Sequence, residues 1–263
     1  MKPTPWQSFM LRVAKEGGDV LMRYFHRPHR IEVKKGAGIV TEADKAAEKV
    51  ILQRISRKFP ESSIITEESG EYRRSDSLCW VIDPLDGTSN YAHGFPWFCV
   101  SIGLYEDGKP VAGVVYHPIL NEMFYAERGR GAYLNGKRIR VSKAKRLDES
   151  LLATGFYYSK GKELQKDVEA FGRMNEAALG VRRPGSAALD LAFVACGRFD
   201  GFWERGLSPW DVAAGFLLVT EAGGTLSDYR GKTTSIFGKE VIASNGHLHT
   251  PMVKHLRGIS RNR

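Results

Sequence analysis

The chain has 263 residues, of which 42% are hydrophobic and 26% charged, the composition of an ordinary globular protein with one large domain or two smaller lobes. No apolar run approaches the roughly 20 residues that a membrane-spanning helix needs, and the N-terminal segment is amphipathic, so we exclude such a helix and expect a soluble, cytoplasmic protein. The formal net charge of +9 favours an anionic ligand, either a phosphate ester or a nucleic acid.

The N-terminal part of the chain is predicted to begin with two helices. Residues 6–25 carry apolar side chains at near-helical spacing. A second helix is predicted to start after Thr41, its N-cap, and to end at the Phe-Pro pair of residues 59–60. The basic segment between them, residues 34–38, is expected to be a mobile loop.

Short β-like runs follow, and they predict a largely antiparallel sheet up to about residue 145. The pair Asn135-Gly136 lies between two such runs and is a strong signal for a type I′ hairpin. The predicted strands are residues 63–65, 79–82, 98–105, 110–116, 122–126, 132–134 and 138–141.

The C-terminal part alternates strands and helices, which favours a mixed α/β fold built in layers. We divide the chain into an α+β lobe, residues 1–145, and an α/β lobe, residues 146–263, which form one compact unit. The predicted strands are residues 151–154, 199–203, around 226 and 241–243, and the predicted helices are 162–178, 186–196, 209–222 and 247–256.

The cysteines and histidines indicate neither a disulfide framework nor a soft-metal centre. The three cysteines are widely spaced and none belongs to a CxxC pair, so we expect buried thiols in a reducing compartment at Cys79, Cys99 and Cys196. His247 and His249 have no acidic or cysteine companion, and a surface loop is expected there rather than a zinc site.

The most informative stretch is residues 80–90, Trp-Val-Ile-Asp-Pro-Leu-Asp-Gly-Thr-Ser-Asn, where a hydrophobic strand runs into two carboxylates. Asp83 and Asp86, at the end of a strand, are well placed to hold a hard cation such as Mg²⁺. If Gly87 and Thr88 open a helix or a nest of amides, their N–H groups would bind a phosphate. The same pattern is also typical of a surface turn.

Three further acidic positions are each ambiguous when taken alone. The run Glu67-Glu68-Ser69 ends a short strand, where adjacent acids are expected to be solvated or metal-bound. Asp211 stands at the head of an apolar helix, and Asp44 follows Thr41 in a capping-box pattern. Helix capping is therefore the alternative to a functional role at both aspartates.

These segments occur together and in a fixed order, and the set resembles the inositol monophosphatase family, within the wider group of lithium-sensitive, Mg²⁺-dependent sugar phosphatases. The resemblance covers nearly the whole chain. It implies an α/β fold of alternating α-β-α-β-α layers and a homodimer. The matching motifs are Val40-Thr41-x-x-Asp44, Glu67-Glu68-Ser69, Asp83-Pro84-Leu85-Asp86-Gly87-Thr88-Ser89-Asn90 and Trp210-Asp211-Val212-Ala213-Ala214-Gly215.

The resemblance also implies a mechanism, in which metal-activated water attacks phosphorus and no covalent phospho-enzyme forms. Thr88 and Asp44 correspond to the family's Thr–Asp pair, which orients or deprotonates that water. The phosphate rests against the amides of Gly87 and Thr88. Two or three Mg²⁺ ions are implied, held by Glu67, Asp83, the carbonyl oxygen of Leu85, Asp86 and Asp211.

For the substrate, the resemblance implies contacts between polyol hydroxyls and a second set of residues. The alternative for Ser186 is a helix N-cap. Arg182 and Arg183 are expected to contact a second anionic group or a neighbouring subunit. The implied substrate-binding residues are Asp86, Gly185, Ser186, Ala187 and Glu204.

One departure and several alternatives remain. The segment that carries the family's lysine is slightly shorter here, which leaves its role open between Lys34 and Lys35. The match at residues 185–187 and at Glu204 favours inositol monophosphate over fructose 1,6-bisphosphate, histidinol phosphate and a 3′-phosphoadenosine nucleotide. A regulatory protein associated with RNA or the transcription machinery is the alternative of another class, although the basic residues 137–140 fit a solvated hairpin strand without RNA-binding aromatics.

Overall fold

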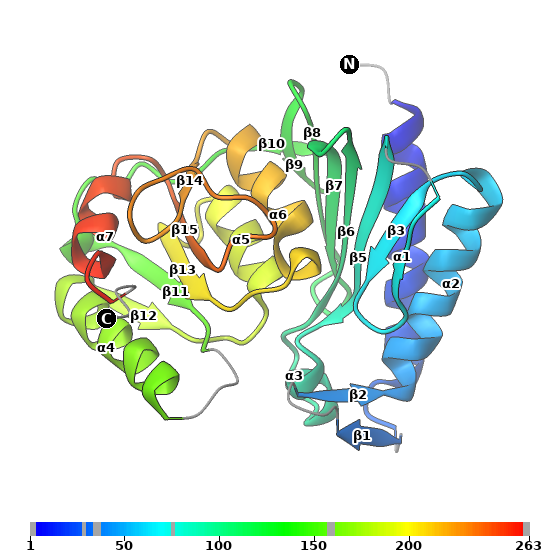
Figure 1. Cartoon of the computed structure of the whole chain (residues 1–263), viewed down its shortest axis with the longest axis horizontal. Helices are drawn as coiled ribbons and strands as arrows, with labels where there is room; N and C mark the ends of the chain where they lie inside the picture. The colour runs from blue at the N-terminus through cyan, green and yellow to red at the C-terminus, as the bar shows by residue number, and fades with distance from the viewer. Residues whose placement is uncertain (1–3, 28–29, 34–37, 75–76, 157–160, 260–263) are drawn as a thin grey trace.

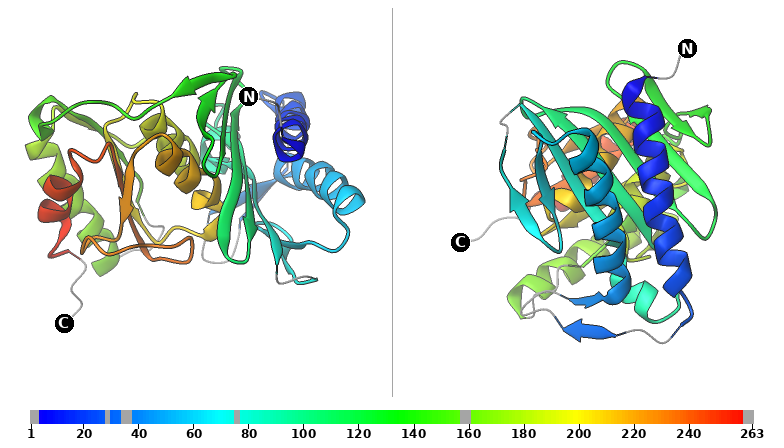
Figure 2. Two further views of the ribbon diagram at one scale, coloured as in Figure 1. Left: turned by 90° about the horizontal axis from the view of Figure 1, so that it is seen from above. Right: turned by 90° about the vertical axis from the view of Figure 1, so that its right-hand side faces the viewer.

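The structure is a computed structural model that describes residues 4–27, 30–33, 38–74, 77–156 and 161–259. Its helices and sheets alternate in five layers, which confirms the predicted layered α/β fold (Figures 1 and 2). From one side to the other, these layers are α1 (Pro5–Tyr24) with α2 (Glu42–Lys58), an eight-stranded sheet, α5 (Ala187–Ala195) with α6 (Pro209–Glu221), a five-stranded sheet, and α4 (Lys162–Ala177) with α7 (His249–Leu256).

The first two helices begin at N-caps that the sequence supplies. The Thr4 hydroxyl accepts a hydrogen bond from Gln7 N, and Pro5 occupies the first turn of α1. Thr41 and Asp44 form the predicted capping box of α2. Gly18 lets α1 pack closely on the sheet, because a Cβ there would lie 2.5 Å from the Tyr116 ring.

The eight-stranded sheet is antiparallel except for the parallel pair β3–β5. Asn135 and Gly136 have φ values of 48° and 77°, which confirms the predicted hairpin turn. The strands, in the order of the sheet, are β10 (Lys137–Ile139), β9 (Gly131–Leu134), β8 (Glu122–Glu127), β7 (Lys109–His117), β6 (Cys99–Glu106), β5 (Leu78–Asp86), β3 (Ser63–Thr66) and β4 (Gly70–Tyr72).

The five-stranded sheet is mixed, with β11 parallel to both of its neighbours and the other pairs antiparallel. The helix pair α5 and α6 lies between the two sheets (Figure 1). In the order of the sheet, the strands are β12 (Gly180–Arg182), β11 (Leu151–Thr154), β13 (Gly201–Arg205), β15 (Glu240–Ser244) and β14 (Thr225–Ser227).

Several short elements complete the described chain. They are β1 (Ile31–Val33), β2 (Ile39–Thr41), α3 (Thr88–Ala92) and a 3₁₀ turn, η1 (Leu147–Glu149). One hydrophobic core joins α5 and α6 to residues of both sheets, such as Val81 and Phe202. The division of the chain at residue 145 stays a prediction.

Two predictions in the C-terminal part need correction. The strand expected at residues 199–203 runs instead over Gly201–Arg205, because Asp200 forms a turn and accepts a hydrogen bond from Leu151 N at 2.7 Å. His249 is not on a surface loop: it is half-buried and hydrogen-bonds Ser244 and Ser227 at 2.9 and 2.8 Å, while His247 is exposed. Burial lowers the pKa of His249.

All three cysteines are free; Cys99 is buried, while Cys79 and Cys196 are only partly buried. None of the helices in the described ranges has the length and apolarity that crossing a membrane requires.

Candidate active site

Three carboxylates from two distant segments meet at one point. Oxygen atoms of Asp83, Asp86 and Asp211 all lie within 4.8 Å of one another. Asp83 and Asp86 end β5, whose register against β6 shifts between them. Side chains alternate along a regular strand, so residues three apart would face opposite sides of the sheet. The register shift brings the Asp83 and Asp86 side chains together, toward Asp211 at the start of α6.

Donors from the chain orient one oxygen of each carboxylate. Asp83 Oδ1 accepts from Leu85 N at 3.0 Å, and Asp211 Oδ2 accepts from Ser208 N at 2.7 Å in the capping box of α6. Asp86 Oδ2 accepts from Ser186 Oγ at 2.6 Å and from Ala188 N at 2.8 Å. Metal-binding carboxylates are typically held by hydrogen bonds of this kind.

The electrostatics of this cluster also fit a bound cation. Burial, followed by the charges of Glu67, Asp86 and Asp211, raises the pKa of Asp83 well above its ordinary value. Burial raises the pKa of Asp86 to about 6, against the opposing effect of the Ser186 hydrogen bond. Like charges gathered in a buried place are costly unless a cation neutralises them, and oxygen ligands suit Mg²⁺. The residues present therefore fit the metal that the resemblance implies.

Glu67 lies just outside this group of three. It follows β3, and its amide donates to Ile82 O at 3.3 Å, so that it lies beside β5. Its charge raises the pKa of Asp44, Asp83 and Asp86. The sequence-predicted metal-binding side chains thus lie in one region, with Glu67 at its edge.

The Gly-Thr turn after β5 opens a short helix, as the sequence suggested. Gly87 has a φ of 92° and is the N-cap of α3. A Cβ on Gly87 would lie 2.7 Å from Trp97 O, so only glycine fits this turn. The carbonyl oxygen of Leu85, an expected metal ligand, accepts a hydrogen bond from Thr88 Oγ1 at 3.0 Å.

Thr88 and Asp44, predicted as a pair, are in contact. Thr88 Oγ1 lies 3.1 Å from Asp44 Oδ1. Asp44 Oδ2 accepts from Thr41 N at 2.8 Å and Thr41 Oγ1 at 2.6 Å, so its capping role and its contact with Thr88 coexist. Asp44 is fully buried, and burial raises its pKa to about 6.

The other predicted substrate residues, at the start of α5 and at Glu204, lie next to the carboxylate cluster. Ser186 is both the N-cap of α5, accepting from Leu189 N at 3.4 Å, and a donor to Asp86. Gly185, with φ 90°, precedes Ser186, and Ala187 is the first residue of α5. Burial and the charges of Asp211 and Asp86 raise the pKa of Glu204 well above its ordinary value, which places its carboxylate near the same cluster.

The two arginines before this turn differ. Both are exposed, and the charge of Arg183 lowers the pKa of Glu204 against the larger opposing effect of burial. Its guanidinium lies 5.7 Å from the centre of the Phe156 ring. Arg182 Nη1 donates to the neighbouring Val181 O at 3.2 Å. Lys34 and Lys35 lie outside the described residues.

Several residues that support the site were assigned no role from the sequence. Gly155 packs on Glu204, since a Cβ there would fall 2.1 Å from Glu204 Oε2. Asn90 Nδ2 donates to Trp97 O at 2.8 Å and to Pro184 O at 2.9 Å, which connects α3 to the turn before α5. Asp190 is a buried carboxylate within apolar α5, and a charge in such a helix was the available signal.

Comparison with known proteins gives a consistent result. Residues 2–261 match the model of the inositol monophosphatase family. An inositol-1-monophosphatase of Synechocystis is 44% identical over 253 residues, covering 95% of this chain and 88% of the relative. The Nus factor SuhB of Escherichia coli is 43% identical over 256 residues and covers 96% of both chains. The crystal structure of the extragenic suppressor protein suhB of Bartonella henselae matches with a TM-score of 0.93 at 40% identity, over 97% of this chain and 99% of that one.

Proposed function

Because this chain belongs to the inositol monophosphatase family, we propose that it is a Mg²⁺-dependent phosphomonoesterase that hydrolyses inositol monophosphate, or a similar polyol or sugar phosphate, to the free polyol and phosphate. The observation that carries the proposal is the convergence of Asp83, Asp86 and Asp211 within 4.8 Å, beside the hydrogen-bonded pair of Thr88 and Asp44.

The proposed cofactor is Mg²⁺, with two or three ions per site. When bound, Mg²⁺ makes a coordinated water more acidic and offsets the negative charge of the phosphoryl group. Burial of the carboxylates keeps bulk water from screening that charge, so each carboxylate–cation attraction is stronger than at an exposed site. The proposed ligands are Glu67, Asp83, the carbonyl oxygen of Leu85, Asp86 and Asp211.

The chain's own residues account for the handling of phosphate and protons. We assign the amides of Gly87 and Thr88 to the phosphate, since the glycine turn lets the ligand approach the backbone. The Thr88 hydroxyl can donate its proton to Asp44 while its oxygen accepts one from a water molecule. Asp44, with a pKa of about 6, is mostly ionised at neutral pH and can accept that hydrogen bond.

The polyol is proposed to lie beside Asp86 and the start of α5. Asp86 and Glu204 would accept hydrogen bonds from its hydroxyl groups, and the Gly185-Ser186-Ala187 turn would line the pocket. Ser186 contributes mainly by holding Asp86, as their 2.6 Å hydrogen bond indicates. We further expect a cytoplasmic homodimer, as in the family.

The test is phosphate release from four substrates, namely inositol 1-phosphate, fructose 1,6-bisphosphate, histidinol phosphate and 3′-phosphoadenosine 5′-phosphate, with Mg²⁺ or with EDTA. We expect Mg²⁺-dependent turnover that is fastest for inositol 1-phosphate. Asp83→Asn removes a central charge of the cluster and is expected to lower kcat/KM at least a hundredfold. A different preferred substrate would leave the site assignment in place and change the substrate.

A second candidate function rests on one observation, the relatives named Nus factor SuhB at 43–44% identity. A role in transcription is compatible with the chain's net charge of +9. Folded wild-type protein that releases no phosphate from any of the four substrates would favour this regulatory function over the enzymatic one.

A further inference from the structure

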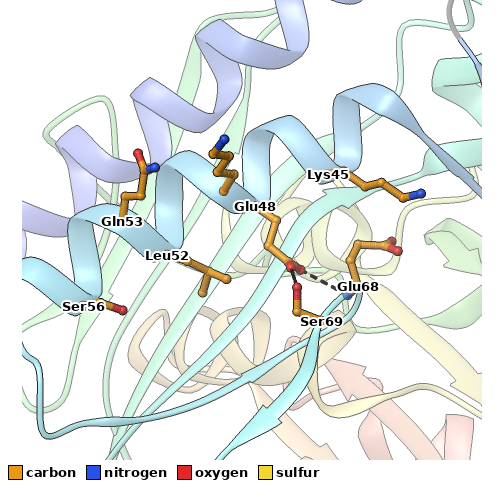
Figure 3. A pocket seen from close by; sticks show the side chains of 8 residues that line it. Lys45, Glu48, Leu52, Gln53, Ser56, Glu68 and Ser69 are labelled. Carbon is orange, nitrogen blue, oxygen red and sulfur yellow. Dashed lines mark hydrogen bonds between the residues drawn. The ribbon is translucent and has the colours of Figure 1, made fainter.

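Glu48 is a buried carboxylate on the inner face of α2, with 3% of its surface exposed. Its Oε2 accepts hydrogen bonds from Thr66 Oγ1 at 2.7 Å and Glu68 N at 3.1 Å, and its Oε1 accepts one from Ser69 Oγ. Figure 3 shows the Glu48 side chain reaching from the helix to the turn that carries Glu68 and Ser69. Three donors of one short segment therefore converge on a single carboxylate.

The residue between these donors is Glu67. Thr66 ends β3, and Glu68 and Ser69 lie in the turn to β4, so Glu48 binds the Thr66 hydroxyl on one side of Glu67 and the Glu68 amide and Ser69 hydroxyl on the other. The Glu67 amide is held separately by Ile82 O. The Glu67 carboxylate is close enough to Asp83 to raise its pKa. Glu48 thus fixes the segment from which Glu67 reaches the carboxylate cluster.

One helical turn earlier, the same helix carries Asp44. Residues four apart lie on the same face of a helix, and both side chains are buried. Asp44 contacts Thr88 after β5, whereas Glu48 holds the turn after β3. Two supports of the site therefore belong to one rigid element.

Burial of Glu48 is costly in itself. A desolvated carboxylate needs partners, and within the described residues Glu48 has hydrogen bonds rather than an ion pair. Lys45 and Glu48 line one pocket beside α2, but Lys45 is paired with Glu32 at 2.8 Å. An apolar side chain would fill this position at a lower desolvation cost. The hydrogen bonds to the segment around Glu67 therefore explain why a carboxylate stands at position 48.

We propose that Glu48 is a positioning residue of the metal site, which sets the affinity for Mg²⁺ by holding Glu67 in place. The inference rests on the proposed function, because Glu67 is assigned as a metal ligand there. It assigns no direct contact with substrate or metal to Glu48.

The experiment measures Mg²⁺ binding to the full chain by isothermal titration calorimetry, without substrate. Glu48→Met keeps a side chain of similar length but accepts none of the three hydrogen bonds, and we expect Mg²⁺ affinity to fall about 10- to 100-fold. Glu67→Gln should weaken binding at least as much. If Glu48 acts through Glu67, the double variant binds no more weakly than Glu67→Gln alone.

The matched control is Glu221→Met. Like Glu48, Glu221 accepts hydrogen bonds with both carboxylate oxygens, here from Gly129 N and Gly131 N at 2.7 Å each, but it lies at the opposite end of α6 from Asp211. Its variant should keep wild-type Mg²⁺ affinity. Folded Glu48→Met with an affinity within twofold of the wild type would overturn the proposal, and so would a double variant that multiplies the two losses.

If Glu48→Met does not fold, Glu48→Gln provides the measurement. Its amide oxygen still accepts from Thr66 and Glu68, so a smaller, few-fold loss of affinity is expected, and no loss would overturn the proposal. Wild-type protein that binds no Mg²⁺ would overturn the proposed function as well. Wild-type binding together with an unchanged Glu48 variant overturns only the role of Glu48.

Discussion

Gly87 is the single residue whose replacement by alanine should reveal most about the backbone of the site. Its φ of 92° is unfavourable for any residue with a Cβ, and the added methyl would lie 2.7 Å from Trp97 O. Gly185 has nearly the same φ, 90°, but the atom nearest to a methyl group added there would be Asn90 Nδ2, at 3.3 Å. We predict a loss of about 2–4 kcal/mol in the free energy of unfolding for Gly87→Ala and about 1 kcal/mol for Gly185→Ala, measured by urea denaturation. Equal losses would mean that conformational strain alone, without the clash, governs both positions.

Which residues the sequence reveals depends on how local their signals are. Asp83 and Asp86 stand in a contiguous motif, so both were predicted as part of the site. Glu48 was not, although it shares a helix face with buried Ala47 and Ile51, because a charged residue in a helix usually points to solvent. Its partners lie 18 to 21 residues further along the chain, beyond any helical or strand period.

Among the secondary-structure elements, α3 and the turn before α5 are joined by one side chain, Asn90. Its Nδ2 donates toward the carbonyl oxygens of Trp97, Pro184 and Gly185. Asn90→Asp places a carboxylate oxygen against these acceptors, so we predict a loss of about 2–3 kcal/mol in unfolding free energy. Asn90→Ala should lose only about 1 kcal/mol, because it removes the donor without adding a repulsive charge.

Comparison of the two Asn90 variants by urea denaturation, with substrate KM as a second readout, checks this prediction. Since Gly185 belongs to the proposed polyol pocket, KM should rise more in Asn90→Asp than in Asn90→Ala. An aspartate variant as stable as the alanine variant would contradict the assigned role of the amide as a donor.

Elements with a long apolar pattern were predicted within one or two residues, such as α1, α2 and β6. The short strands β1, β2, β4 and β12 were not predicted. Each has three residues, and β1 and β4 are exposed along their whole length, so neither alternation nor a buried face marks them in the sequence. They form only by pairing with a neighbouring strand, which the local sequence does not encode.

At the scale of the whole molecule, the layered α/β class could be predicted from the order of strands and helices, but the meeting of distant segments could not. Asp211 is more than 120 residues from Asp83, and helix capping explains it equally well in sequence. The structure brings the two together because α6 packs against β5 and β6. The family resemblance, rather than any residue pattern, supplied the expectation of this contact.

Because the site gathers buried carboxylates, their contribution to the stability of the whole molecule should depend on pH in opposite ways with and without metal. Asp44 and Asp86 have pKa values of about 6 in the folded protein, above the ordinary value of 3.8. Between pH 7.5 and 5.5 these two carboxylates therefore take up protons in the folded state but not in the unfolded state, whereas His117 and His249, whose pKa values burial lowers, do the reverse. In EDTA we predict that the two carboxylates add about 1–2 kcal/mol to the unfolding free energy as the pH falls through this range. The histidine contribution is common to both buffers, so the difference between urea denaturation in EDTA and in Mg²⁺ measures the carboxylate contribution. With saturating Mg²⁺ the trend should reverse, because metal binding requires deprotonated ligands.

Asp83→Asn separates this electrostatic cost from other effects of pH. The amide oxygen can still accept from Leu85 N, so the turn is kept while one buried charge is removed. In EDTA at pH 7.5 the variant should be about 1–2 kcal/mol more stable than the wild type, since Asp83 lies among three other carboxylates. At a Mg²⁺ concentration a hundred times the Kd, the wild type should gain about 2.7 kcal/mol and the variant much less, which reverses their order. Urea denaturation of both proteins in the two buffers measures this crossing. A variant less stable than the wild type in EDTA would show that Asp83 stabilises the metal-free fold. It would contradict the prediction that the carboxylate cluster lowers the unfolding free energy when no metal is bound.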